Sequence, residues 1–201
     1  MFVEDTMTAN EALSLLLEGN ERYANMQSNH PGQTIERRNE VAGGQHPFAI
    51  IFGCVDSRVP PEMVFDQGLG DLLVIRTAGH VIGDAALGSI EFGVEELGIP
   101  LIIVLGHEKC GAVAATITAV EQGVTAHDKI QTIVDHIKPA VEQAKDQPGD
   151  LCHNAVWSNI ELVVNTLKET PLLQEFVEKD KLTIVGACYE LETGKVALLE
   201  S

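Results

Sequence analysis

Positive charge and aromatic rings are both scarce in this chain of 201 residues. Lysine and arginine together number 13 against 30 aspartates and glutamates, so the formal net charge is −17 at pH 7. A surface of this sign repels nucleic-acid phosphates and anionic membrane surfaces, so neither is an expected partner. Aromatic residues make up only 4% of the chain, which is typical of an α/β protein packed with aliphatic side chains. No apolar run approaches the roughly 20 residues that a membrane-spanning helix needs.

Cysteine is limited to four residues, and the N-terminus lacks the basic segment of a secretion signal. Four cysteines without an export signal favour a reducing compartment, where thiols stay free and bind metals more readily than they form disulfides. We therefore expect a cytoplasmic protein. Cys152 and Cys188 stand in no ligand-like spacing, and we interpret them as small apolar residues.

Apolar runs alternate with helical patterns from residue 48 onward. This alternation predicts an α/β fold in which a parallel sheet of four strands carries helices on both faces. The segment Tyr189–Gly194 is too short for a parallel crossover, so the fifth strand is expected at the edge, antiparallel to its neighbour. Pro171 is expected to end a helix that begins at Asp150. The predicted strands are 48–53, 72–76, 101–106, 182–187 and 195–199.

The first 47 residues follow a different pattern. Thr8 and Glu11 form a capping box at the start of an amphipathic helix over residues 8–26. Residues 28–47 are polar and typical of a surface connection. We expect one domain over residues 1–201, with an N-terminal helical arm and connection at 1–47 and an α/β core at 48–201.

Two short motifs follow the first and third apolar runs. They are Cys54-Val-Asp-Ser-Arg58 and His107-Glu-Lys-Cys110. Ligand sites in open α/β sheets gather at the carboxyl ends of strands, so the two cysteines and the histidine can converge if these strands are neighbours. Two thiolates and one imidazole favour zinc over magnesium, calcium or manganese. Three protein ligands leave a fourth position open, which is typical of catalytic zinc.

An acid and a base accompany the first cysteine. Residues i and i+2 of an extended segment point the same way, so Asp56 and Arg58 are expected to pair. A bidentate pair lowers the pKa of the carboxyl group and keeps it off the metal. If the pair broke, Asp56 would be free to become a fourth metal ligand and close the site.

The residues alone leave other interpretations open. Cys54 beside Arg58 is also compatible with a nucleophilic thiol. A fully structural zinc would need a fourth ligand, for which Cys152 or Cys188 is available. His80 is interpreted either as a solvated loop histidine or as a proton shuttle.

The two motifs closely resemble those of the β-class carbonic anhydrases, whose signature is Cys-x-Asp-Ser-Arg followed by His-x-x-Cys-Gly. Further matches are Val74–Gly79 and Gly88–Glu91, and the stretches Ile51–Val59 and Phe65–Asp71 look like the actinobacterial branch. The resemblance extends over about residues 8–199, nearly the whole chain.

This resemblance implies reversible hydration of carbon dioxide to bicarbonate and a proton, by attack of a zinc-bound hydroxide, in a dimer or tetramer. It implies one Zn²⁺ per subunit and a substrate pocket that two subunits share. The implied metal ligands are Cys54, His107 and Cys110, the implied catalytic pair is Asp56 and Arg58, and the implied substrate contacts are Gln67 and the backbone N–H of Gly111.

Two sets of positions bear on how closely the chain follows the family. Many relatives carry a glutamine where this chain has Gly68, and Gln67 stands one residue earlier. Some relatives have a second, regulatory bicarbonate pocket, for which Arg76 and Tyr189 match but Ile51 replaces a tryptophan.

Two alternative functions remain open. One is hydrolysis of carbonyl sulfide or carbon disulfide on the same scaffold, and the other is that of a non-catalytic zinc-stabilised binding module.

Overall fold

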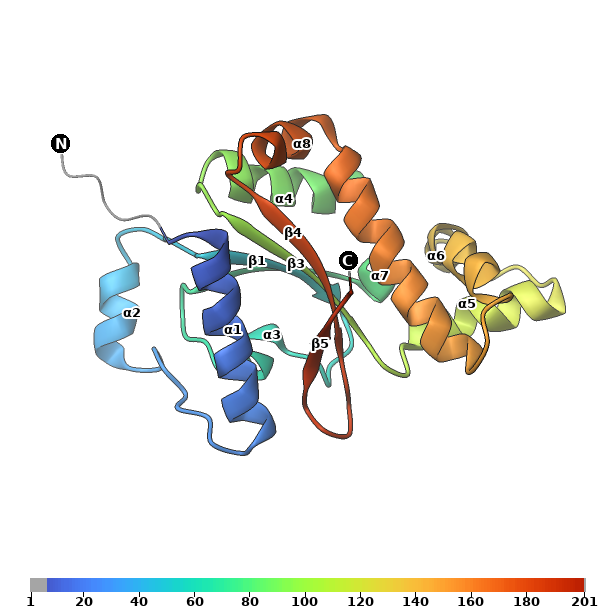
Figure 1. Ribbon diagram of the computed structural model, residues 1–201, viewed down its shortest axis with the longest axis horizontal. Coiled ribbons are helices and arrows are strands. Elements are labelled where there is room, and N and C mark those ends of the chain that lie inside the picture. The colour runs from blue at the N-terminus through green and yellow to red at the C-terminus, as the bar shows by residue number, and fades with distance from the viewer. Residues whose placement is uncertain (1–6, 201) are drawn as a thin grey trace.

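Within residues 7–200, which the computed structural model describes, five strands form one sheet in the order β2-β1-β3-β4-β5 (Figure 1). The first four strands pair in parallel, and β5 pairs antiparallel with β4. The predicted fold class, four parallel strands plus an antiparallel edge strand, is therefore confirmed. The strands are β1 (Ala49–Cys54), β2 (Leu72–Thr77), β3 (Leu101–His107), β4 (Thr183–Tyr189) and β5 (Val196–Leu198).

One face of the sheet carries the larger core. Because side chains alternate along a strand, Ile50 and Phe52 of β1 point to the same face as Ile102 and Val104 of β3, and all four are fully buried there. Five helices cover this face and the carboxyl end of the sheet (Figure 1). They are α4 (Asp84–Glu95), α5 (Gly111–Gln122), α6 (Ile130–Ala144), α7 (Leu151–Glu169) and α8 (Pro171–Glu178).

The opposite face carries α1 (Ala9–Ala24) and the short α3 (Pro61–Val64). Leu16 of α1 is fully buried there against a core that includes Ile51 and Ile103. The capping box at Thr8 is present, so this helix begins where the sequence predicts. Helices thus lie on both faces, as expected. Residues 1–6 of the predicted arm, and Ser201, lie outside the described residues.

Two helices differ from the prediction. The connection at 28–47 contains α2 (Ile35–Val41), which buries none of its residues and therefore shows no apolar periodicity in the sequence. Its start is set by Thr34, whose side chain accepts a hydrogen bond from the N–H of Arg37. Pro171 does not only end α7 but also begins α8, because a proline in the first turn loses no intrahelical hydrogen bond.

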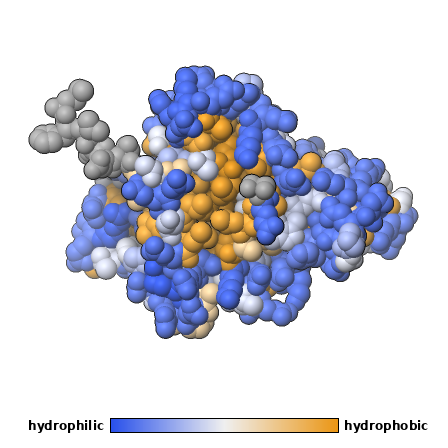
Figure 2. All heavy atoms as spheres, in the orientation of Figure 1, coloured by the Kyte–Doolittle hydropathy of each residue, from blue (hydrophilic) through white to orange (hydrophobic). Residues whose placement is uncertain are grey.

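The face that α1 covers stays partly open. Leu13, Val185 and Val196 pack against its core but are only partly buried, and Leu198 is 36% exposed. Figure 2 shows apolar surface gathered between α1 and strands β4 and β5. In the part of the chain that the structure describes, no helix is long and apolar enough to cross a membrane.

The strand order creates a crevice at the carboxyl ends of β1 and β3. The chain passes from β1 to β2 on one side and then crosses back to β3 on the other side of β1. Such a reversal of direction opens a gap at the strand ends, where ligands of open α/β sheets bind. Cys54 is the last residue of β1 and His107 the last of β3, so the fold brings both motifs to this crevice.

Candidate metal centre

Cys54, His107 and Cys110 converge at the crevice. Their ligand atoms all lie within 4.8 Å of one another, and none of the three residues is more than 5% exposed. Cys110 immediately precedes the first turn of α5, so its sulfur lies beside the free N–H groups at that helix start. Within residues 7–200 this is the one cluster of three or more potential metal ligands at such distances.

The ring of His107 is oriented so that one nitrogen can bind a metal. His107 Nδ1 lies 2.8 Å from the backbone oxygen of Glu108. A carbonyl oxygen can only accept, so Nδ1 carries a proton and Nε2 is the ring nitrogen left to bind a metal. That Nε2 atom is buried and has no hydrogen-bond partner among the described residues. Metal-binding histidines are typically held in this way, with the distal N–H donated to a carbonyl or carboxylate.

The two sulfurs also fit a cation. The neighbouring Cys110 side chain holds the pKa of the Cys54 thiol well below its usual range, helped by His107 and by the N–H of Gly79 at 3.3 Å, although burial opposes this. The same contact with Cys54, together with burial, raises the pKa of the Cys110 thiol. Two buried sulfurs can therefore both ionise only beside a positive charge, and this soft donor set suits zinc.

Asp56 and Arg58 form the pair that their spacing predicts. Arg58 Nε donates to Asp56 Oδ1 at 2.9 Å and Nη2 donates to Oδ2 at 2.7 Å. The backbone N–H of Arg58 also donates to Oδ1, at 3.0 Å. Because of the guanidinium, the pKa of Asp56 lies well below its usual range. Its Oδ2 is 3.8 Å from His107 Nε2, so an ionised carboxylate faces the metal-ligand cluster.

Arg76 reaches the same segment from β2. Its Nε donates to the backbone oxygen of Cys54 at 2.7 Å and its Nη2 to that of Asp56 at 2.6 Å. The guanidinium is thus bound to the backbone beside Cys54. Tyr189 packs in the core under α1, and its hydroxyl lies 3.2 Å from that of Tyr23. The regulatory bicarbonate role of these two residues stays a prediction.

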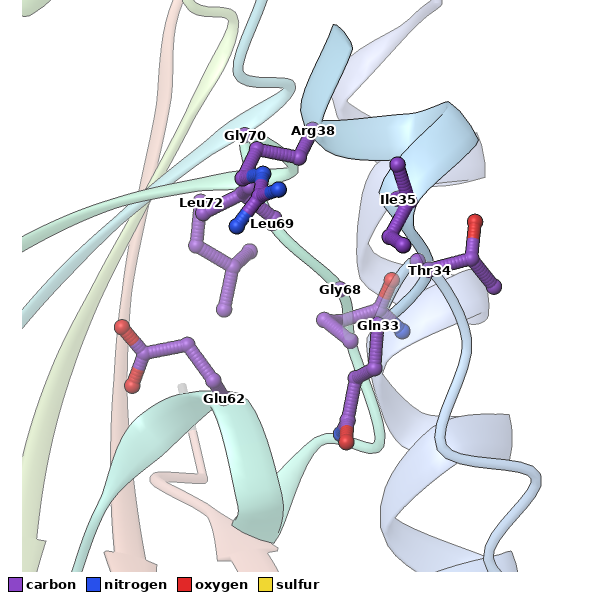
Figure 3. A pocket seen from close by; sticks show the side chains of 11 residues that line it. Gln33, Thr34, Ile35, Arg38, Glu62, Gly68, Leu69, Gly70 and Leu72 are labelled. Carbon is purple, nitrogen blue, oxygen red and sulfur yellow. The ribbon is translucent and has the colours of Figure 1, made fainter.

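Gln67 does not belong to the metal-ligand cluster. Its Nε2 donates to the backbone oxygen of Phe65 at 2.9 Å, and its side chain lines a cavity of about 540 Å³ between α2, α3 and the segment that leads into β2 (Figure 3). Arg38 and Glu62 line the same cavity, whose described lining includes no member of the metal-ligand cluster. Gly111, by contrast, follows Cys110 directly, and a Cβ there would meet no atom within 4 Å, so its backbone is approachable.

Sequence reasoning misjudged His80 and overlooked Asn159. His80 is 2% exposed, with its ring edge-on to Phe52, so the interpretation as a solvated histidine is wrong. Burial lowers its pKa to about 4, which argues against proton shuttling near neutral pH. Its Nε2 lies 2.8 Å from Nδ2 of Asn159. The one signal for Asn159 in the sequence is a polar residue within the buried stripe of α7.

Comparisons with known proteins agree with this geometry. The carbonic anhydrase family model matches residues 49–196. Carbonic anhydrase 2 of Mycobacterium tuberculosis is 40% identical over 188 residues, which cover 93% of this chain and 91% of the relative. The carbonic anhydrase of Mycolicibacterium smegmatis matches with the same identity and coverage. The solved β-carbonic anhydrase CcaA aligns with a TM-score of 0.74 at 26% identity, over 94% of this chain and 95% of that one. The motifs, the sheet that unites them and these matches agree, and the chain belongs to the β-carbonic anhydrase family of enzymes.

Proposed function

We propose that this protein catalyses the reversible hydration of carbon dioxide to bicarbonate and a proton, with one Zn²⁺ per subunit. The observation that carries the proposal is a buried group of two sulfurs and one nitrogen that faces a carboxylate locked by arginine. Three donors leave a coordination position free, as in catalytic zinc sites. Cys152 and Cys188, the candidates for a fourth ligand, are not members of the group.

Zinc held by Cys54, His107 and Cys110 would supply a water that ionises near neutral pH and a positive charge beside the substrate. Asp56 then acts as a hydrogen-bond acceptor, because Arg58 keeps it ionised and turns it toward the cluster. An acceptor in this place orients a water for attack on the carbon of carbon dioxide. The proton released in hydration passes to solvent or buffer.

Gly111 and Gln67 complete the proposed substrate site. The N–H of Gly111 lies in the first turn of a 12-residue helix, where unpaired donors stabilise negative charge on a substrate oxygen. Gln67 would contact substrate from the neighbouring subunit of a dimer or tetramer. The partly open apolar face beside α1 supports self-association, since apolar surface of this kind is usually covered.

The test is stopped-flow hydration of carbon dioxide on protein whose zinc content is measured. We expect fast turnover with about one zinc per chain, lost on chelation. Cys54→Ser and Cys110→Ser should lose zinc and activity together, whereas Cys152→Ser, the matched thiol control, should keep both. Zinc retained in both ligand variants would contradict the metal site. Sulfide release from carbonyl sulfide or carbon disulfide, or bound zinc without any turnover, would instead favour the alternative functions.

A further inference from the structure

A tight turn after β2 supplies a hydrogen bond to one metal ligand. The backbone N–H of Gly79 points at Cys54 Sγ, 3.3 Å away. Gly79 has a φ of 61°, and a Cβ there would come within 2.6 Å of Ile137 Cδ1 and 3.0 Å of Ala112 Cβ. Only glycine therefore allows this peptide to approach the sulfur, and the side chain of Thr77 closes the turn by donating to the oxygen of Val81 at 2.8 Å.

The other side of the same turn is held from α7. Asn159 Nδ2 lies 3.0 Å from the backbone oxygen of Gly79 and 2.8 Å from His80 Nε2. Because the Gly79 oxygen can only accept, the NH₂ group of the amide must face it. The second N–H of that group then points at His80 Nε2, which must accept. The geometry thus assigns His80 as a neutral imidazole with its proton on Nδ1, a buried nitrogen that has no hydrogen-bond partner among the described residues.

We infer that Asn159 is a positioning residue of the metal centre. Its amide binds the carbonyl oxygen of Gly79 and the ring of His80, and so holds the turn in the place where the N–H of Gly79 points at Cys54 Sγ. This inference rests on the metal site of the proposed function. Asn159 is 3% exposed and stands between core residues on α7, so its amide has little freedom to move. Partners of this kind orient metal ligands and adjust how strongly they bind the ion.

The experiment compares Asn159→Leu with Asn154→Leu. Both asparagines lie on α7 and donate to a backbone oxygen, but Asn154 bonds to Pro148, outside the turn. We expect Asn159→Leu to bind Zn²⁺ about 10- to 100-fold more weakly in competition with a chelating dye. Its Co²⁺-substituted form should also show a shifted sulfur-to-cobalt absorption band, which a mere loss of fold stability would not produce. Asn154→Leu should match the wild type in both readouts.

A folded Asn159→Leu protein with wild-type zinc affinity and an unchanged cobalt spectrum would overturn the inference. A wild type that binds no zinc would overturn the proposed function as well, so the two failures are distinguishable. If Asn159→Leu does not fold, NMR on the wild-type protein tests the inference instead. Imidazole ¹⁵N shifts should place the His80 proton on Nδ1, and ¹¹³Cd-loaded protein should show coupling from the metal to the Gly79 amide proton. A proton on Nε2, or no such coupling, would overturn the assignment.

Discussion

Replacing Arg58 with alanine should separate activity from stability. The substitution removes two charge-assisted hydrogen bonds to Asp56, at 2.9 and 2.7 Å, and leaves only the backbone N–H of residue 58 on the carboxylate. Without the guanidinium, Asp56 is free to rotate toward the metal-ligand cluster, one atom of which, His107 Nε2, is 3.8 Å away. We expect the carboxylate either to lose its orientation or to occupy the free coordination position.

The two effects differ in size. The Arg58 side chain is 51% exposed, so solvent screens the pair, and its loss should lower the free energy of unfolding only slightly. A misplaced hydrogen-bond acceptor affects catalysis far more, because correctly positioned acid–base groups contribute about 10²- to 10⁴-fold. We therefore expect kcat/KM to fall by at least about 10-fold while zinc content and stability stay near those of the wild type.

Stopped-flow hydration, zinc analysis and urea unfolding on the same preparations measure these quantities. Arg58→Lys is the matched control, because lysine keeps the charge but cannot form the bidentate contact, and it should recover only part of the activity. Turnover within twofold of the wild type in Arg58→Ala, at equal zinc content, would refute the role of the pair.

Three further outcomes are expected. Although burial raises the pKa of Asp66, the N–H groups of Asn29 and His30 and the side chain of Arg22 lower it overall. The stability that this carboxylate contributes is fully present above its unfolded pKa of about 4 and is lost as the pH falls through its folded pKa. Asp66→Asn should therefore lower the free energy of unfolding by about 1.5–3 kcal/mol at pH 7, and by less when urea unfolding is measured at acid pH. Ile160 fills the space above two strand glycines, and Ile160→Ala should lower the free energy of unfolding by about 2–5 kcal/mol; a loss below 1 kcal/mol would contradict this packing. Chelation should lower the melting temperature of the wild type but leave that of Cys54→Ser unchanged, because only the wild type holds a zinc ion that stabilises its folded state and that the chelator removes.

Local patterns were sufficient to predict the strands and the three side chains that the structure brings together at the candidate metal centre. Each buried strand is a short apolar run bounded by turn residues, and period-two alternation sorts residues such as Ile50 and Ile51 onto opposite faces. The pairing of Asp56 with Arg58 was predicted correctly, but the extended segment assumed for it was wrong. Ser57 and Arg58 lie in a turn that the N–H of Val59 closes by donating to the backbone oxygen of Asp56 at 3.1 Å, and this turn brings the two side chains together. Helix α2 escaped prediction because a helix with no buried residue carries no apolar period.

The sequence by itself determined the donor atoms, the fold class and the two strand ends that carry them. Only the tertiary structure decided that β1 lies beside β3, that His80 is buried, and that Asn159 reaches a turn 80 residues away in the chain. The physical reason is the separation along the chain. Periodicity and spacing report on contacts between residues a few positions apart, whereas the surroundings of a buried polar group depend on which distant elements pack against it. The role proposed for Asn159 requires that α7 pack against β3 and β4.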